Sequence, residues 1–136
     1  MNQIRFLEPR SDIVARRDEI RAGLAGLVPA DCLVTEEREL VPFETDAFTA
    51  YRRVPLAVVL PETTGQVAAV MKYCAENGVP VVPRGAGTSL AGGAIPQEDA
   101  VVIGVSKMTR LLEVDYENRT AKVQAGVTNL RISDEV

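Results

Sequence analysis

Residues 83–93 read Pro-Arg-Gly-Ala-Gly-Thr-Ser-Leu-Ala-Gly-Gly and follow directly after the apolar run 79–82. This stretch holds four of the ten glycines of the chain. Glycine tolerates positive φ and places no Cβ between backbone N–H groups and a ligand. Successive N–H groups turned inward form a concave nest that binds anions, most often phosphate. The stretch therefore predicts a strand that ends in an anion-binding loop.

Two familiar phosphate-binding patterns do not fit this loop. Gly87 and Gly92 have the glycine spacing of a Walker loop, but no lysine follows Gly92, which excludes a nucleoside triphosphatase of that kind. Gly85 and Gly87 open a Rossmann pattern, but Leu90 stands where the third glycine belongs. The glycines and proline within 92–96 also disfavour an immediate helix. What remains is a nest that depends on no helix.

Three polar residues lie inside the candidate nest. Arg84 is a nearby cation, and Thr88 and Ser89 are hydroxyl donors. We expect Leu90 to pack the loop onto the sheet rather than to contact a ligand. Two alternatives stay open: the loop is a surface turn that binds nothing, and Arg84 is a solvated charge.

The sequence around the loop predicts a β-α-β unit. An unbroken apolar run at 56–60 indicates a buried strand. A helix then begins at Thr63 or Thr64 and ends at Asn77-Gly78, and residues 79–83 return as a second, parallel strand. The helix face expected to be buried consists of Val67, Val70, Met71, Cys74 and Ala75. The glycine-rich loop follows the carboxyl end of the second strand, where open α/β sheets bind ligands.

The flanking segments complete an α+β fold. Residues 11–27 predict an N-terminal helix, 33–35 a short extended piece, 36–40 a helical turn and 42–55 an irregular connector. After the loop, 100–105 predicts a third strand, and 111–115 with 120–124 an antiparallel hairpin. Thr128 is positioned to cap a last helix. We divide the chain into a helical extension and connector, 1–50, and the domain proper, 51–136.

Composition excludes several function classes. The net charge is −4 with scattered basic residues, so nucleic-acid binding is not expected. There is no histidine, which excludes a Ser-His triad and removes the commonest zinc ligand, and Cys32 and Cys74 are too few for a metal site. No apolar run approaches the ~20 residues of a membrane span, and residues 1–10 lack the apolar core of a signal peptide. These features predict a cytoplasmic protein.

At these motifs the chain resembles the flavoproteins of the vanillyl-alcohol-oxidase type, with a PCMH-type FAD-binding domain. The loop 83–93 matches their pyrophosphate loop, and the blocks at 45–61 and 125–133 follow the same family order. The resemblance runs from about Leu33 to the last residue. Within the family it is greatest to FAD-dependent 2-hydroxyacid dehydrogenases, including the FAD-binding subunit of bacterial glycolate oxidase and D-lactate dehydrogenases. The resemblance implies that the loop contacts FAD through Pro83, Arg84, Gly85, Ala86, Gly87, Thr88 and Ser89.

Departures from the family pattern limit what the chain is expected to do alone. Covalently flavinylated relatives carry a histidine in or beside the loop, where this chain has Thr88, so FAD is expected to bind non-covalently. The family's substrate-binding and catalytic residues follow what would be residue 136, so no catalytic residue is assigned here. We therefore expect an incomplete FAD-binding domain that is inactive alone and self-associates. The longer parent would oxidise a 2-hydroxy acid such as glycolate or D-lactate, with an iron–sulfur subunit as a further partner. The alternative is a non-catalytic module that binds an anion, a nucleotide or another protein.

Overall fold

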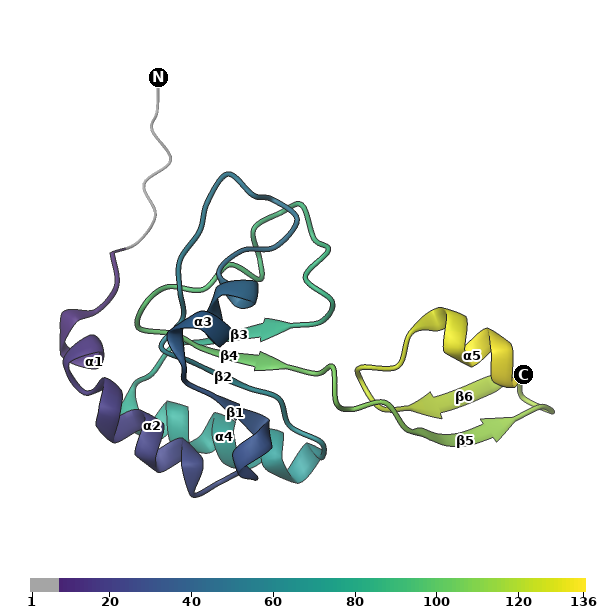
Figure 1. Ribbon diagram of the computed structural model, residues 1–136. Coiled ribbons are helices and arrows are strands. Elements are labelled where there is room, and N and C mark those ends of the chain that lie inside the picture. The colour runs from purple at the N-terminus through teal and green to yellow at the C-terminus, as the bar shows by residue number, and fades with distance from the viewer. Residues whose placement is uncertain (1–7) are drawn as a thin grey trace.

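The structure is a computed structural model that describes residues 8–136 (Figure 1). The signal-peptide prediction, made on residues 1–10, therefore lies largely outside the described residues. The helices are α1 Ser11–Ala15, α2 Arg17–Ala25, α3 Glu37–Leu40, α4 Thr64–Asn77 and α5 Asn129–Glu135, with 3-10 turns η1 Ala30–Cys32 and η2 Val41–Phe43. The strands are β1 Leu33–Val34, β2 Ala57–Val59, β3 Val81–Arg84, β4 Val101–Gly104, β5 Leu111–Asp115 and β6 Thr120–Val123.

Strands β1 to β4 form one sheet in the order β1-β2-β4-β3. The predicted β-α-β unit is present, but β2 and β3 do not pair with each other. Strand β4 lies between them and pairs in parallel with both, with Val102 opposite Val58 of β2 and Val82 of β3. The two residues of β1 pair antiparallel with the other side of β2. The carboxyl ends of β2, β3 and β4 therefore share one end of the sheet.

Both faces of this sheet are covered, which explains why its strands are continuously apolar. On one face Ala57, Val59, Val101 and Ile103 pack against α1, α2 and α4. On the other face, alternate residues such as Val58 and Val102 pack against Leu40 of α3 and against the connector that follows it, and a further set is half-buried there. Figure 1 shows α2 and α4 on one side of the sheet and α3 on the other.

Helix α4 is defined at both ends by its caps. The Thr63 hydroxyl accepts a hydrogen bond from the Gln66 backbone N–H at 3.2 Å, and the Gln66 side chain accepts one from Thr63 N–H, which makes a capping box. Gly78 ends the helix in the left-handed conformation, with φ of 66°. The predicted buried face is narrower than expected: Val70 and Cys74 are buried, but Met71 is 47% exposed.

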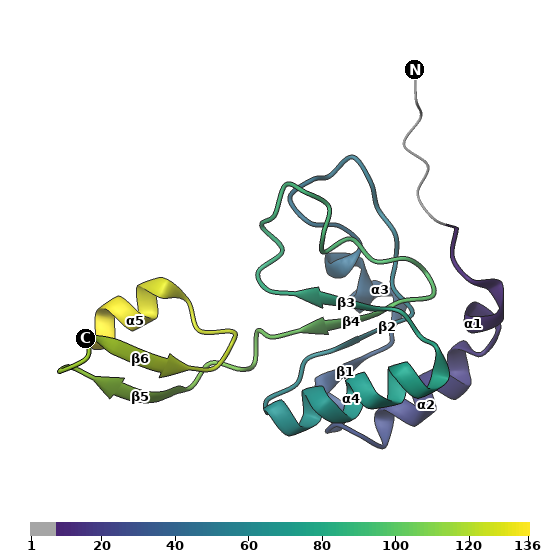
Figure 2. The ribbon, with the colours of Figure 1, turned by 180° about the vertical axis from the view of Figure 1, so that it is seen from behind.

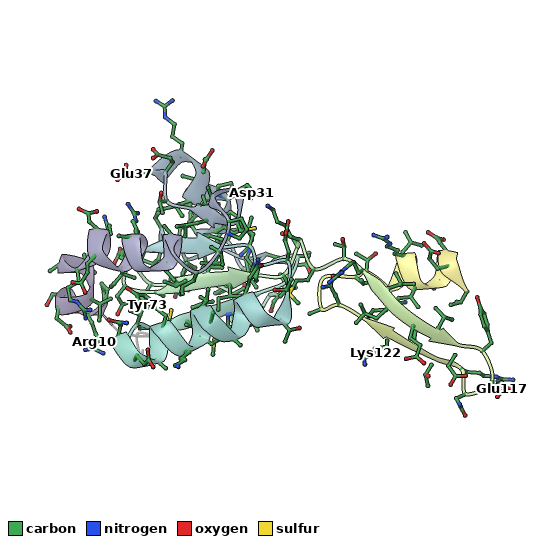
Figure 3. All side chains as sticks on the ribbon, turned by 90° about the horizontal axis from the view of Figure 1, so that it is seen from below. Arg10, Asp31, Glu37, Tyr73, Glu117 and Lys122 are labelled. Atoms are coloured by element: carbon green, nitrogen blue, oxygen red, sulfur yellow. The ribbon has the colours of Figure 1, made fainter. Side chains whose placement is uncertain are left out.

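Tyr73 accounts for that difference. Its ring reaches α2 beside Gly23, where any Cβ would collide with the phenol group. Figure 3 shows Tyr73 on the side of α4 that faces α2. The core-facing side of α4 is therefore rotated toward Tyr73 and away from Met71, a choice that the residue spacing alone did not determine.

The predicted N-terminal helix is divided in two. Helix α1 ends at Ala15, the N–H of the next residue, Arg16, donates to the Ile13 carbonyl at 3.0 Å, and α2 begins at Arg17. No proline or glycine marks this point in the sequence. The apolar face is still placed as expected, because Ile13, Ile20 and Leu24 are buried in the main core.

The remaining elements form a second, smaller unit. Strands β5 and β6 pair antiparallel as the predicted hairpin, and Thr128 caps α5 by accepting from Arg131 N–H at 3.3 Å. Figures 1 and 2 show this hairpin unit, residues 111–136, set apart from the sheet and joined to it by the segment after β4. The mixture of parallel sheet, antiparallel hairpin and helices confirms the α+β prediction. The division at residue 50 stays a prediction, and the helices before it share their core with the sheet.

Candidate cofactor site

The glycine-rich loop begins where β3 ends, as predicted. Gly87 has φ of 72° and Gly92 has φ of 74°, conformations that side-chain-bearing residues rarely adopt. Within residues 8–136, the backbone N–H groups of residues 85–90 donate no hydrogen bond to the protein. The next N–H, of Ala91, donates to the Ser89 hydroxyl at 3.2 Å. The loop therefore presents a run of N–H donors that have no acceptor among residues 8–136.

The loop glycines differ in how much space surrounds them. A Cβ added to Gly85 or Gly93 would meet no atom within 4 Å, so the outer side of the loop is open. A Cβ on Gly87 would collide with the guanidinium of Arg84. Gly87 is thus favoured chiefly by its positive φ, and its lack of a side chain also leaves room for the Arg84 guanidinium.

Arg84 is not a freely solvated charge. One of its Nη atoms donates to the Thr45 carbonyl at 2.7 Å and the other to the Pro42 carbonyl at 3.3 Å. Its guanidinium carbon lies 5.6 Å from the centre of the Phe43 ring, a cation–π distance. Arg84 therefore ties the end of β3 to the connector 42–55. The sequence analysis missed this role because the partners are backbone carbonyls far away in sequence.

The connector forms the neighbouring wall of the site. Asp46 is buried and its Oδ1 accepts from Phe48 N–H at 2.8 Å, while Oδ2 has no partner among the described residues. Arg52 pairs with Glu44 at 3.2 Å, and Arg53 with Glu98 at 3.8 Å. These arginines thus act as surface links of the connector, and we assign them no ligand.

One prediction about the loop is wrong. Leu90 does not pack onto the sheet, because it is 75% exposed. The residues predicted to contact FAD, Pro83 to Ser89, form a continuous strip at the carboxyl end of β3, in which Gly85, Ala86, Thr88 and Ser89 are exposed. The strip suits a diphosphate: neutral N–H donors stabilise the negative charge, and the open side leaves room for the phosphates.

A parallel sheet with an N–H nest at its strand ends is typical of domains that bind a nucleotide cofactor. The family model described as FAD binding domain matches residues 55–136. Those residues include every strand except β1, the whole glycine-rich loop and α5. The chain belongs to the FAD-binding domain family, and the cofactor prediction, FAD, is confirmed.

Individual relatives agree with this assignment. The chain is 41% identical over 120 residues to the glycolate oxidase subunit GlcD of Escherichia coli (strain K12), which covers 88% of this chain and 24% of that protein. It is 46% identical over 77 residues to the D-lactate dehydrogenase of Archaeoglobus fulgidus, covering 57% of this chain and 17% of that protein. The chain thus spans about a quarter or less of the length of these relatives.

Solved structures confirm the PCMH-type fold. p-Cresol methylhydroxylase with substrate bound superposes with a TM-score of 0.77 at 24% identity, over 93% of this chain and 25% of that one. Alkyldihydroxyacetonephosphate synthase gives 0.78 at 19% identity over 98% of this chain and 26% of that one. Among residues 8–136, no helix has both the length and the apolar character that a membrane crossing requires.

Proposed function

We propose that residues 83–89 hold the diphosphate of FAD in a flavin-dependent oxidoreductase that oxidises 2-hydroxy acids. The observation that supports this most directly is the run of N–H groups, 85–90, which donate to no acceptor among residues 8–136. Unpaired backbone donors are costly when they are withdrawn from water, so a loop of this shape gains most from a bound anion.

The proposed contacts divide into three roles. Gly85 and Gly87 admit the phosphates, because neither carries a side chain on the open loop. The N–H groups from Gly85 to Ser89 donate to the phosphate oxygens, and the hydroxyls of Thr88 and Ser89 add donors. Pro83 and Arg84 position the loop, Arg84 through its hydrogen bonds to the connector.

FAD would supply the two-electron redox chemistry when bound. The chain's own contribution is to orient the cofactor and to neutralise its phosphates. It contains no histidine, so none of these 136 residues can form a histidyl bond to FAD, and the proposed nest holds the cofactor non-covalently. We assign no catalytic residue and no metal to these 136 residues.

The nest is tested by titrating the ¹⁵N-labelled chain with FAD and, separately, with ADP, which carries the same diphosphate. Amide NMR signals of residues 85–89 are expected to shift with both ligands, and more than those of the hairpin unit. Gly87→Val should abolish these shifts, since a β-branched residue disfavours positive φ and its Cβ collides with Arg84.

Gly93→Val is the matched control for that substitution. Gly93 lies in the same loop, but a Cβ there meets nothing within 4 Å. Its shifts on FAD addition should match those of the unmodified chain. Equal loss of binding in both variants, or shifts confined to another region, would contradict the proposal that residues 83–89 bind the diphosphate.

The substrate class rests on the relatives named glycolate oxidase subunit and D-lactate dehydrogenase. The relatives that carry these names are much longer chains. The test therefore uses the protein expressed from the whole open reading frame that contains these residues. Anaerobic bleaching of its flavin absorbance by glycolate or D-lactate supports the proposal, and no bleaching with either acid contradicts it.

Partners and location remain part of the proposal. A glycolate-oxidase-like assembly would add an iron–sulfur subunit, and the longer protein is expected in the cytoplasm. Exposed apolar side chains of the hairpin unit, such as Leu112 and Leu130, favour self-association of the 136-residue chain. Analytical ultracentrifugation checks this, with a strictly monomeric chain as the contrary result.

A further inference from the structure

The side-chain amine of Lys107 lies against a buried thiol. Lys107 is in the segment that joins β4 to β5, and its Nζ donates to the Asp31 carbonyl at 2.9 Å and to Asp31 Oδ2 at 2.6 Å. The same Nζ lies 3.6 Å from Sγ of Cys32. Asp31 and Cys32 belong to η1, directly before β1, and Figure 3 labels Asp31 there. The contact therefore joins two segments that are far apart in sequence.

The second cysteine has no such neighbour. Cys74 is fully buried in the main core, and burial raises the pKa of its thiol to about 11. Within residues 8–136, no lysine nitrogen donates to Cys74. Both cysteines have a relative exposure of 0%, but Cys32 has the Lys107 amine and the carboxylates of Asp31 and Glu62 beside its sulfur. This makes Cys74 an internal control.

Solvent reaches the Lys107 side of the pair. A cleft of about 330 Å³ is lined by Glu62, Thr63, Lys107, Arg110 and Gln124. The Lys107 side chain is 30% exposed. A small oxidant that enters this cleft therefore reaches the Lys107 side chain, whose Nζ lies 3.6 Å from the buried Sγ of Cys32.

A metal ion is a weaker explanation of the same cluster. Ligand atoms of Asp31, Cys32 and Glu62 lie within 4.8 Å of one another. The Lys107 ammonium already contacts Asp31 and Cys32 and supplies the positive charge that a metal would bring. The cluster is thus an amine–thiol pair held in place by a carboxylate.

We propose that Cys32 and Lys107 are a modification site at which hydrogen peroxide forms a covalent cross-link between Sγ and Nζ. In the first step sulfur attacks a peroxide oxygen, the O–O bond breaks, the thiol is oxidised by two electrons to a sulfenic acid, and water leaves. In the second step the neutral amine attacks that sulfur, the S–O bond breaks and the S–N bond forms. The second water carries away an amine proton, so thiol, amine and one peroxide give a sulfenamide and two waters.

The amine must lose its extra proton before the second step. The hydrogen bond from Lys107 to Asp31 holds the pKa of that ammonium above its usual value. The other ionisable or charged groups beside it are the Cys32 thiol, Glu62 and Arg110. Cross-linking is therefore expected to be slow at neutral pH and to accelerate as the pH rises toward the Lys107 pKa.

The test is peroxide treatment of the folded 136-residue chain over a range of pH, followed by tryptic digestion without reductant and mass spectrometry. The expected product joins the peptide containing Cys32 to the peptide containing Lys107, with two hydrogens fewer than their sum. Trypsin should no longer cleave after Lys107, and dithiothreitol should release the two peptides.

Two variants make the result specific. Lys107→Arg keeps a cation beside Asp31 but removes the nucleophilic amine, so no joined peptide is expected and dimedone should instead trap a sulfenic acid at Cys32. Cys74→Ser should give the joined peptide at the yield of the unmodified chain. The proposal is overturned if peroxide leaves Cys32 unmodified, if Cys74 reacts in its place, or if dimedone traps Cys32 in the unmodified chain and no joined peptide appears at alkaline pH.

Discussion

The sheet body, residues 8–105, and the hairpin unit, residues 111–136, both contain paired strands, but the strands of the body are almost entirely apolar and those of the hairpin unit alternate with charged residues such as Glu113 and Lys122. In the body, β2 and β4 are buried along their whole length. In the hairpin unit, β5 and β6 contain no buried residue, and Gln124 is the buried residue of the unit. The comparison shows that strand burial follows both composition and cover, because the apolar strands of the body lie between helices on both faces and the mixed strands of the hairpin unit do not.

The two regions also differ in what a substitution can disturb. The body is stabilised by packed apolar side chains, whereas the hairpin unit relies on strand pairing, a helix cap and a few polar contacts to the body. Buried side chains that lose volume leave cavities, while exposed ones do not. The expected effects below therefore fall in size from the body to the tip of the hairpin.

The largest contrast is between two leucine truncations. Leu24→Ala removes a fully buried side chain from the main core and should lower the free energy of unfolding by about 3 kcal/mol. Leu112→Ala, at a position 51% exposed, should change it by less than about 0.5 kcal/mol. Urea denaturation of both variants measures the difference. Similar losses would mean that the hairpin unit has a core of its own.

Gly126→Ala tests the joint between the two regions. Gly126 N–H donates to the Met108 carbonyl at 2.9 Å, and a Cβ at this position would collide with the Val105 carbonyl oxygen. Backbone must move to accept it, which costs about 1–3 kcal/mol. Hydrogen exchange should report faster exchange in β5 and β6 with little change in β2 and β4. Uniformly faster exchange in both regions would show that they unfold as one.

Gln124→Leu removes the polar link at the same joint. Its side chain accepts from Arg110 N–H at 2.9 Å and donates to the Glu62 carbonyl at 3.0 Å. Loss of these hydrogen bonds should destabilise the hairpin unit by about 1 kcal/mol, since leucine fills the space but pairs with neither group. Amide NMR signals of Arg110 and of residues 111–124 measure the change, and unchanged signals would contradict the link.

The smallest effect lies in the hairpin turn. The pKa of Asp115 is held below its ordinary value of 3.8, chiefly by the side chain of Asn118, which donates at 2.7 Å. Because the carboxyl pKa is lower in the folded chain than in the unfolded chain, the ionised Asp115 stabilises the turn at pH values above the unfolded-state pKa. This stabilisation is lost as the pH falls through the folded-state pKa. NMR titration of the Asp115 carboxyl should give a low midpoint, and Asn118→Ala should move it back toward 3.8. A midpoint unaffected by the substitution would exclude this cause.

Local signals predicted the elements of the body well. The Thr63 cap, the Asn77-Gly78 stop and the apolar runs on either side define the β-α-β unit, because each acts within a few residues. Strand order was beyond these signals: nothing in β2 or β3 shows that β4 pairs between them. The division at Arg16 was missed because no proline, glycine or capping side chain marks it in the sequence.

The candidate site was only partly accessible from sequence. Glycine content identified the loop and its N–H donors, because positive φ is a property of the residue type. The prediction that Leu90 packs onto the sheet was wrong, because the apolar character of one loop residue does not determine whether the loop contacts the sheet. The role of Arg84 depends on the backbone carbonyls of Pro42 and Thr45. Every residue has a backbone carbonyl, so the amino-acid sequence does not indicate which ones accept a hydrogen bond.

The strand order has a consequence for how the chain assembles. Strands β2 and β3 are the first two parallel strands to be synthesised, yet each finds its parallel partner in β4, which follows both in the chain. During translation the ribosome must therefore release residues up to about 104 before any parallel pairing can begin, and the glycine-rich loop must close at that moment. Long-range pairing of this kind slows folding. The loop proposed to hold the cofactor thus also sets part of the entropic barrier to folding, and substitutions that stiffen it would alter the folding rate as well as the site.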